Sequence, residues 1–217
     1  MSRIEATLLE HMGNDLTVVN AARVSFGKRK EVFEPKDAQL IRYLAEHEHT
    51  SPFGHCFASF HVKAPIFVAR QLVKHKFLRW NEISRRYVDD APSFYLPKDW
   101  RGKSKDKKQG SSSETIDVVY YDRDDGYASW PEDAILVATE AYNKMLELGV
   151  APEHARMVLP QNTMTEWYWS GSLDAFSDMC VLRLKDDSQY ETRLVAQQVS
   201  KEMEKVFPVS WKELTFE

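Results

Sequence analysis

The segment from Cys56 to Pro65 places the tightest local constraint on the fold. Apolar side chains alternate with polar or exposed ones, and Cys56, Ala58, Phe60 and Val62 share one face. This period of two is typical of a strand with one buried face. Pro65 suits the first turn of a helix, where its missing N–H leaves no acceptor unsatisfied. The sequence therefore predicts a strand that leads directly into a helix.

Helical spacing continues beyond Pro65 and predicts which face of that helix is buried. The expected buried stripe consists of Ile66, Ala69, Val73 and Phe77. Another face carries polar side chains spaced i, i+3 and i+4, namely Gln71, Lys74 and His75.

Residues 70–87 combine positive charge with hydrogen-bonding side chains. Six cations flank a single carboxylate, Glu82, and these are Arg70, Lys74, Lys76, Arg79, Arg85 and Arg86. The whole chain has a formal net charge of -4, so this positive charge is local. Such a cluster indicates a site for a small phosphorylated molecule whose other end is recognised through hydrogen bonds.

The remaining pattern predicts several helices and a second strand. The expected helices cover residues 16–26, with Asn14 or Asp15 as the N-cap, then 37–45, 135–149, 152–160 (carrying Arg156), 173–184 and 189–206. Alternation over residues 163–169 predicts the strand. Helices and strands that do not alternate strictly, in 217 residues, favour an α+β fold in one domain with a small antiparallel sheet.

Composition sets further expectations. Residues 98–114 are rich in Lys, Ser, Gly and Asp, and we expect a mobile loop there, either a solvated insertion or a flap over a ligand. Cys56 and Cys180 are the two cysteines; they form no CxxC pair and are expected to be buried in a reducing compartment. No apolar run reaches the roughly 20 residues of a membrane span, and we expect a cytoplasmic protein that does not bind membranes.

Several other sites are disfavoured by the pattern. Five histidines fall between positions 47 and 75, but no HExxH motif or cysteine partner completes a zinc site. No P-loop or GxGxxG motif is present. Ser84 lies between Ile83 and Arg85, not on the tight elbow of an activated serine. Trp80 and Tyr87 could stack on bases, but the net negative charge argues against a nucleic-acid surface.

The cationic window resembles the signature of the flavin-dependent thymidylate synthases. Lys74-His75-Lys76 is followed after seven residues by Ser84, within the run Asn81-Glu82-Ile83-Ser84-Arg85-Arg86-Tyr87. Other segments are similar to that family along nearly the whole chain: residues 12–15, 21–26, 51–55, 60–65, 155–160 and Leu182-Arg183 followed by Glu191.

The resemblance implies a reaction and an assembly. The reaction is the reductive methylation of dUMP to dTMP, with 5,10-methylenetetrahydrofolate as carbon donor and NADPH reducing a bound FAD. The implied assembly is a homotetramer with active sites between subunits. No metal is expected.

The resemblance also assigns roles by position. Arg183 matches the arginine that polarises the uracil ring. The implied dUMP contacts are Gln71, Lys74, Glu82, Ile83, Ser84, Arg85, Arg86 and Arg183, with Arg156 supplied by a neighbouring subunit. The implied FAD contacts are Ser51, Lys74, His75, Lys76, Glu82, Ser172, Asp174, Asp178 and His49, the last at the flavin or folate face.

The chain departs from the family pattern at several of these positions. Lysines at 74 and 76 replace arginines, and Arg79 occupies a position that is commonly small. Ser172, Asp174 and Asp178 stand where Asn, Arg and Asn often bind FAD. An alternative hypothesis is a non-catalytic nucleotide- or single-strand-binding protein on the same scaffold, which would have no need of the ring-polarising Arg183.

Overall fold

The structure is a computed structural model that describes residues 2–88, 90–105, 110–122 and 126–215. Its strands are β1 (Glu5–Met12), β2 (Phe57–Pro65), β3 (Leu78–Glu82), β4 (Arg101–Lys103), β5 (Ser111–Thr115), β6 (Val119–Asp122), β7 (Gly126–Ser129) and β8 (Met164–Ser172). Its α-helices are α1 (Asp15–Arg23), α2 (Pro35–Glu46), α3 (Ile66–Leu72), α4 (Trp130–Glu147), α5 (Pro152–Ala155), α6 (Leu173–Arg183), α7 (Tyr190–Val206) and α8 (Pro208–Thr215). Three short 3-10 helices are η1 (Val24–Phe26), η2 (Phe53–His55) and η3 (Arg156–Val158).

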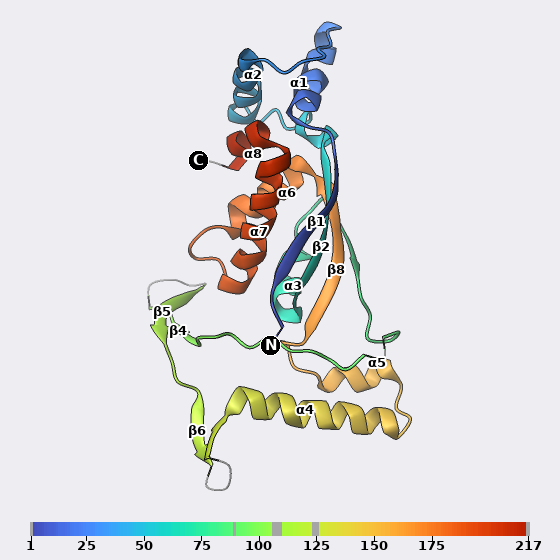
Figure 1. Ribbon diagram of the computed structural model, residues 1–217, viewed down its shortest axis with the longest axis vertical. Helices are drawn as coiled ribbons and strands as arrows, with labels where there is room; N and C mark the ends of the chain where they lie inside the picture. Colours follow the sequence, from blue (N-terminus) through green and yellow to red (C-terminus); the bar gives the residue numbers. More distant parts are fainter. Residues whose placement is uncertain (1, 89, 106–109, 123–125, 216–217) are drawn as a thin grey trace.

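The centre of the fold is a four-stranded antiparallel sheet in the order β1-β2-β8-β3. Helices α6 and α7 lie along one side of it, and α8 packs between them and α2 (Figure 1). The α4–α5 unit and the hairpin β6–β7 lie apart from this body, at the lower end of Figure 1, whereas the hairpin β4–β5 contacts the start of α7 through the ion pair of Arg101 with Glu191. The arrangement confirms the α+β class and the antiparallel sheet.

Aromatic side chains on the inner face of the sheet form the core. Trp80 of β3 stacks on Trp167 of β8, with ring centroids 4.2 Å apart. Phe176 of α6 meets Phe60 and Trp169 edge-on, at 5.2 and 5.4 Å. Burial of these large rings, each removing on the order of 150–250 Å² from water, fixes α6 against the sheet.

Most of the predicted elements are confirmed, among them β2, β8, α1, α2, α4, α6 and α7. Asn14 caps α1, and its side chain accepts a hydrogen bond from the Thr17 backbone N–H at 3.1 Å. Both Cys56 and Cys180 are buried, as predicted, and burial raises the pKa of each thiol.

The predicted extent of the helix after Pro65 is wrong. Helix α3 ends at Leu72, and residues 73–77 form a turn. Val73 and Phe77 were expected in the buried stripe, but they are 50% and 80% exposed. The chain must reverse here because β3 returns along β8, and a longer helix would prevent that pairing.

The sequence pattern also missed several elements: β1, β3, both small hairpins and α8. Strands β4 and β5 fall within the segment predicted as a loop, residues 98–114, of which positions 106–109 lie outside the described residues. The mobility of residues 98–114 stays a prediction. In the part of the chain that the structure describes, no helix is long and apolar enough to cross a membrane.

Candidate active site

The turn between α3 and β3 carries the centre of the cationic window. It passes close to β8 because residue 171 is glycine: a Cβ there would lie 2.5 Å from Leu78 Cδ2 and 3.0 Å from the carbonyl oxygen of Phe77. Lys74, His75 and Lys76 therefore lie in a turn held against the end of β8, and not on the helix as the i, i+3, i+4 spacing had predicted.

Arg183, at the last position of α6, is held by two contacts from this region. Its Nε donates to Nε2 of His75 at 2.9 Å, and its Nη2 donates to the carbonyl oxygen of Gln71 at 3.2 Å. A guanidinium only donates, so Nε2 of His75 must accept and the ring proton must be on Nδ1. Burial, and secondarily the charge of Arg183, lowers the pKa of His75 to about 4, which keeps this ring neutral near pH 7.

Among the described residues, none of the six cations of the window forms an ion pair with a carboxylate. Arg85 donates to the carbonyl oxygen of Asp90, and Arg86 Nε donates to Ser84 Oγ at 3.2 Å. Lys74, Lys76 and Arg79 are exposed. Uncompensated cations this close together favour an anionic ligand.

Glu82, the carboxylate of the window, is held by uncharged donors. Its oxygens accept from Trp80 Nε1 at 3.1 Å and from Thr165 Oγ1 at 2.6 Å. It ends β3, whereas the turn with His75 precedes β3. Five strand residues span about 13 Å, at roughly 3.3 Å per residue. The predicted dUMP contacts at Glu82, Ser84, Arg85 and Arg86 thus lie at the opposite end of β3 from the Arg183 contacts.

A second group of predicted residues gathers where β8 passes into α6. Ser172 is the N-cap residue of α6, and Asp174 follows in its first turn. Gly54 of η2 lies beside Asp174, because a Cβ at Gly54 would come within 3.9 Å of Asp174 Oδ1. This places the Ser51–Gly54 turn next to α6. Asp174 Oδ1 is buried without a hydrogen-bond partner in the described structure. The pKa of Asp178 is raised, first by burial and then by the nearby negative charge of Asp174.

The two remaining predicted residues are His49, two positions before Ser51 in the sequence, and Arg156. His49 is exposed and meets the rings of Tyr43 and His47 at 6.0 and 6.2 Å. Arg156 is exposed at the start of η3, which packs against α4 and α5. In Figure 1 the α4–α5 unit lies at the lower end of the molecule, away from α6.

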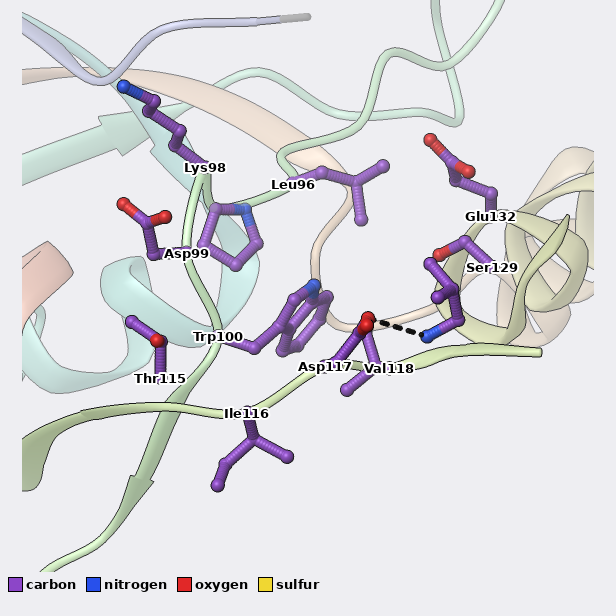
Figure 2. A pocket seen from close by; sticks show the side chains of 12 residues that line it. Leu96, Lys98, Asp99, Trp100, Thr115, Ile116, Asp117, Val118, Ser129 and Glu132 are labelled. Carbon is purple, nitrogen blue, oxygen red and sulfur yellow. Dashed lines mark hydrogen bonds between the residues drawn. The ribbon is translucent and has the colours of Figure 1, made fainter. Parts of the chain in front are cut away.

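Two cavities differ in their relation to these residues. One of about 390 Å³ is bordered by Ile83 and Arg85 and by Lys63, Thr165 and Glu166 of the sheet. Figure 2 shows another, of about 440 Å³, between residues 96–100, residues 115–119 and the start of α4. Its charged lining is mainly acidic, with Asp99, Asp117 and Glu132 against Lys98, and it contains no predicted site residue. The first cavity has a mixed lining, with Glu5, Asp90 and Glu166 beside Arg3, Lys63 and Arg85, but it contains the predicted site residues Ile83 and Arg85 and is therefore the better continuation of the anion site.

Sequence reasoning named Arg183 and His75 separately and missed their contact. They are separated by 108 positions, and no local pattern links them. Thr165, the partner of Glu82, was also missed as a site residue. Its alternation with Trp167 predicted a strand but carried no sign that its hydroxyl faces a carboxylate.

An α+β domain in which an anchored arginine lies beside cations that no described carboxylate neutralises has the features of a site for a phosphorylated small molecule. The family described as thymidylate synthase complementing protein matches residues 7–209. Flavin-dependent thymidylate synthases of Kosmotoga olearia and Thermus thermophilus are 42% and 39% identical to the chain, over 94% of it and over 87% and 73% of their own lengths. The chain belongs to this family, the flavin-dependent thymidylate synthases.

Solved structures show the same relationship. The UMP/dUMP methylase PolB from Streptomyces cacaoi, bound with 5-Br dUMP, superimposes with a TM-score of 0.81 at 31% identity. The match covers 99% of this chain and 95% of PolB. A second structure of PolB, bound with 5-Br UMP, gives a TM-score of 0.79.

Proposed function

We propose that the chain converts dUMP to dTMP, taking the new carbon from 5,10-methylenetetrahydrofolate and the reducing electrons from NADPH through FAD. In the net reaction, C5 of the uracil gains a methyl group and loses a proton, while tetrahydrofolate and NADP⁺ are released. Reduced FAD, when bound, would supply the hydride that reduces the transferred one-carbon unit to a methyl group. The observation that carries the proposal is the anchored Arg183 beside cations that no described carboxylate neutralises.

Arg183 is assigned to the pyrimidine. Its two contacts fix the guanidinium while Nη1 remains without a hydrogen bond among the described residues. A fixed cation beside the uracil would stabilise negative charge developing on N3 and the carbonyl oxygens, and this makes C5 more nucleophilic. Gln71, whose carbonyl oxygen is engaged by Arg183, keeps its side-chain amide for the base edge.

The phosphate is assigned to the residues after β3. Ser84, Arg85 and Arg86 provide a hydroxyl and two guanidiniums, and of these three residues Arg85 lines the cavity that Ile83 borders. Arginine suits a phosphate because its planar fork donates two parallel hydrogen bonds. The uncharged contacts of Glu82 leave these guanidiniums free of an internal carboxylate.

The described residues also fit a flavin dinucleotide. Lys74 and Lys76 present unneutralised ammonium groups suited to a pyrophosphate. Asp174 Oδ1, buried without a partner in the described structure, could accept from a ribose hydroxyl or a ring N–H. We assign Ser51, Ser172, Asp174 and Asp178 to the cofactor with the turn residues Lys74, His75 and Lys76, and Glu82; His49 would face the flavin or the folate.

The separation of these groups supports sites shared between subunits of a homotetramer. The Arg183 contacts, the Ser84–Arg86 segment and Arg156 occupy three places on one chain. Apolar residues on α4 and on the adjoining η3 are also exposed: Leu136 and Val137 of α4 at 59% and 64%, and Met157 of η3 at 72%. Exposed apolar surface of this kind marks interaction surfaces. We therefore assign Arg156 to the dUMP site of a neighbouring subunit.

Incubation of the purified protein with FAD, NADPH, methylenetetrahydrofolate and dUMP, followed by mass spectrometry, tests the reaction. Mass increase of the nucleotide by one methylene would support it, and no product with FAD bound would instead favour the nucleotide-binding alternative. UMP should be assayed in parallel, because PolB has been solved with both 5-Br UMP and 5-Br dUMP. A higher kcat/KM for UMP would overturn the assignment of dUMP.

Mixing Arg156→Ala with Arg183→Ala subunits tests the shared site. Neither variant alone should form dTMP at the normal rate, but a mixed oligomer can assemble a site with both arginines intact. Recovery of part of the activity on mixing is the expected result. If mixed oligomers form but no activity returns, either both arginines belong to a site formed by one chain or Arg156 is not part of the dUMP site.

A further inference from the structure

Phe77 is exposed at the centre of the candidate site. Its side chain is 80% exposed, although helical spacing predicts that it is buried. It lies in the turn directly after Lys76 and does not belong to the core cluster. In the described residues its ring makes no contact with another aromatic ring or with a cation.

The backbone of Phe77 is also strained. Its φ is +64°, in the left-handed region that bulky residues rarely adopt, and Glu48 is the other non-glycine residue with positive φ in the described chain. Such conformations persist where surrounding structure imposes them, and they cluster at ligand sites. Here the carbonyl oxygen of Phe77 lies against Gly171, so β8 fixes the turn.

Both strained residues lie beside positions assigned to the cofactor. Glu48 immediately precedes His49, and Phe77 immediately follows Lys76. The residue against which the Phe77 turn rests, Gly171, immediately precedes Ser172. The exposed ring of Phe77 therefore belongs to the end of β8 where the cofactor residues gather, away from the Ser84–Arg86 segment at the other end of β3.

We propose that Phe77 is a cofactor-binding residue whose ring stacks on the planar ring system of FAD. The inference rests on the proposed function, which supplies the flavin. A large planar heterocycle matches an exposed aromatic ring better than the small uracil, to which Arg183 and Gln71 are already assigned. Stacking on the flavin would explain why the ring of Phe77 is exposed and its backbone strained, since the ring contacts no aromatic ring or cation in the described chain.

Titration of the apoprotein with FAD tests this inference with three variants. Phe77→Gly removes the ring and suits the left-handed backbone, so the FAD dissociation constant should rise about 3- to 10-fold. The melting temperature of the apoprotein should not fall, because glycine relieves the strain. Phe77→Tyr should retain affinity within about twofold, since the ring remains. Phe77→Asn, another residue that tolerates positive φ, should behave as the glycine variant does.

Phe26 provides a matched control, since it is 78% exposed but lies on η1. Phe26→Ala should leave the FAD dissociation constant unchanged. Unchanged affinity in Phe77→Gly, with FAD binding to the parent chain, would overturn the role of Phe77 alone. Failure of the parent chain to bind FAD would overturn the proposed function and this inference together. If sedimentation instead shows that Phe77→Gly dissociates the oligomer while its affinity for FAD is unchanged, the ring contacts a second subunit and not the flavin.

Discussion

Arg183 Nε donates a hydrogen bond to Nε2 of His75 across 2.9 Å, and this contact joins the end of α6 to the turn before β3. Burial lowers the pKa of the Arg183 guanidinium, but arginine stays charged in proteins. The histidine is therefore a neutral acceptor that holds a cation, the reverse of its common role as a donor to a carboxylate. The position of the proposed ring-polarising charge thus depends on the protonation state of His75.

Replacing Arg183 by alanine should remove turnover and leave flavin binding intact. Loss of one preorganised donor to developing charge typically lowers kcat by about 10² to 10³. Steady-state rates and FAD titration measure the two effects separately. Arg42→Ala is a suitable control, because Arg42 contacts Glu213 on the surface at 3.2 Å, outside this site. Near-normal turnover without Arg183 would leave it as a structural arginine of α6.

His75 should make the protein less stable in mild acid. Its pKa is about 4 when folded, compared with about 6.5 for an unperturbed histidine, so the unfolded chain binds more protons between these values. The free energy of unfolding should therefore fall as pH decreases from 6.5 towards 4, and His75→Gln should lack this component. Urea unfolding at pH 7, 5.5 and 4.5 should show the stability difference between parent and variant narrowing as pH falls.

A variant of another histidine controls for the loss of an imidazole as such. His55 is exposed and takes no part in the Arg183 contact. His55→Gln should keep the His75–Arg183 contact and with it the fall in stability between pH 6.5 and 4. If the stability of His75→Gln falls as steeply as that of the parent, His75 does not titrate as the buried acceptor of Arg183.

Arg79 should compensate for the lysines at positions 74 and 76. A lysine offers a point charge where the family's arginine offers a bidentate fork. Arg79 is exposed and is the second residue of β3, two positions after the turn ends at Phe77. Arg79→Ser should raise the FAD dissociation constant about tenfold, or roughly 1.4 kcal/mol. Restoration by Lys74→Arg with Lys76→Arg would support compensation, and an unchanged constant in Arg79→Ser would exclude it.

The sequence predicted the paired strands β2 and β8 because both alternate regularly and both are half buried. It did not predict β3, in which Arg79, Asn81 and Glu82 are exposed and which pairs along a single edge, with β8. Local periodicity extended α3 to Phe77, but pairing of β3 with β8 ended that helix at Leu72. Tertiary pairing overrode local propensity at the very turn that carries the cationic site.

Helix α8 shows a different limit. Pro208 follows the helix predicted over residues 189–206 and begins α8, which the sequence did not predict. The reason lies 194 residues earlier: the carboxylate of Asp15 accepts from the backbone N–H groups of Val209 and Ser210, at 3.0 and 2.8 Å. A carboxylate at these free N–H groups stabilises the start of a helix. No pattern within residues 206–215 reveals this partner. The Arg183–His75 contact was missed for the same reason.

Asp37 should contribute more to stability than any surface ion pair near it. Its side chain is fully buried and accepts from Lys30 Nζ at 2.5 Å, the Glu34 backbone N–H at 2.9 Å and Arg23 Nη2 at 3.0 Å. Burial raises the pKa of Asp37, but these three donors outweigh it and leave the pKa below the ordinary value. The carboxylate therefore ties α1 and the loop at Lys30 to the first turn of α2.

Asp37→Asn keeps the shape of this side chain but leaves Lys30 and Arg23 without their shared charge. We expect a loss of about 2 kcal/mol in the free energy of unfolding at pH 7, less than for a fully buried pair because Lys30 reaches solvent. Because the folded pKa is depressed, the stabilisation is present above the unfolded value of about 3.9 and is lost as pH falls through the folded pKa. Urea unfolding should therefore show the difference in free energy of unfolding between variant and parent shrinking below pH 3.9.

Lys36→Ala is the control for Asp37→Asn. It removes only the exposed contact with Glu34 and should change stability little, both at pH 7 and below pH 3.9. An Asp37→Asn variant as stable as Lys36→Ala would show that the hydrogen bonds at this position suffice without the charge.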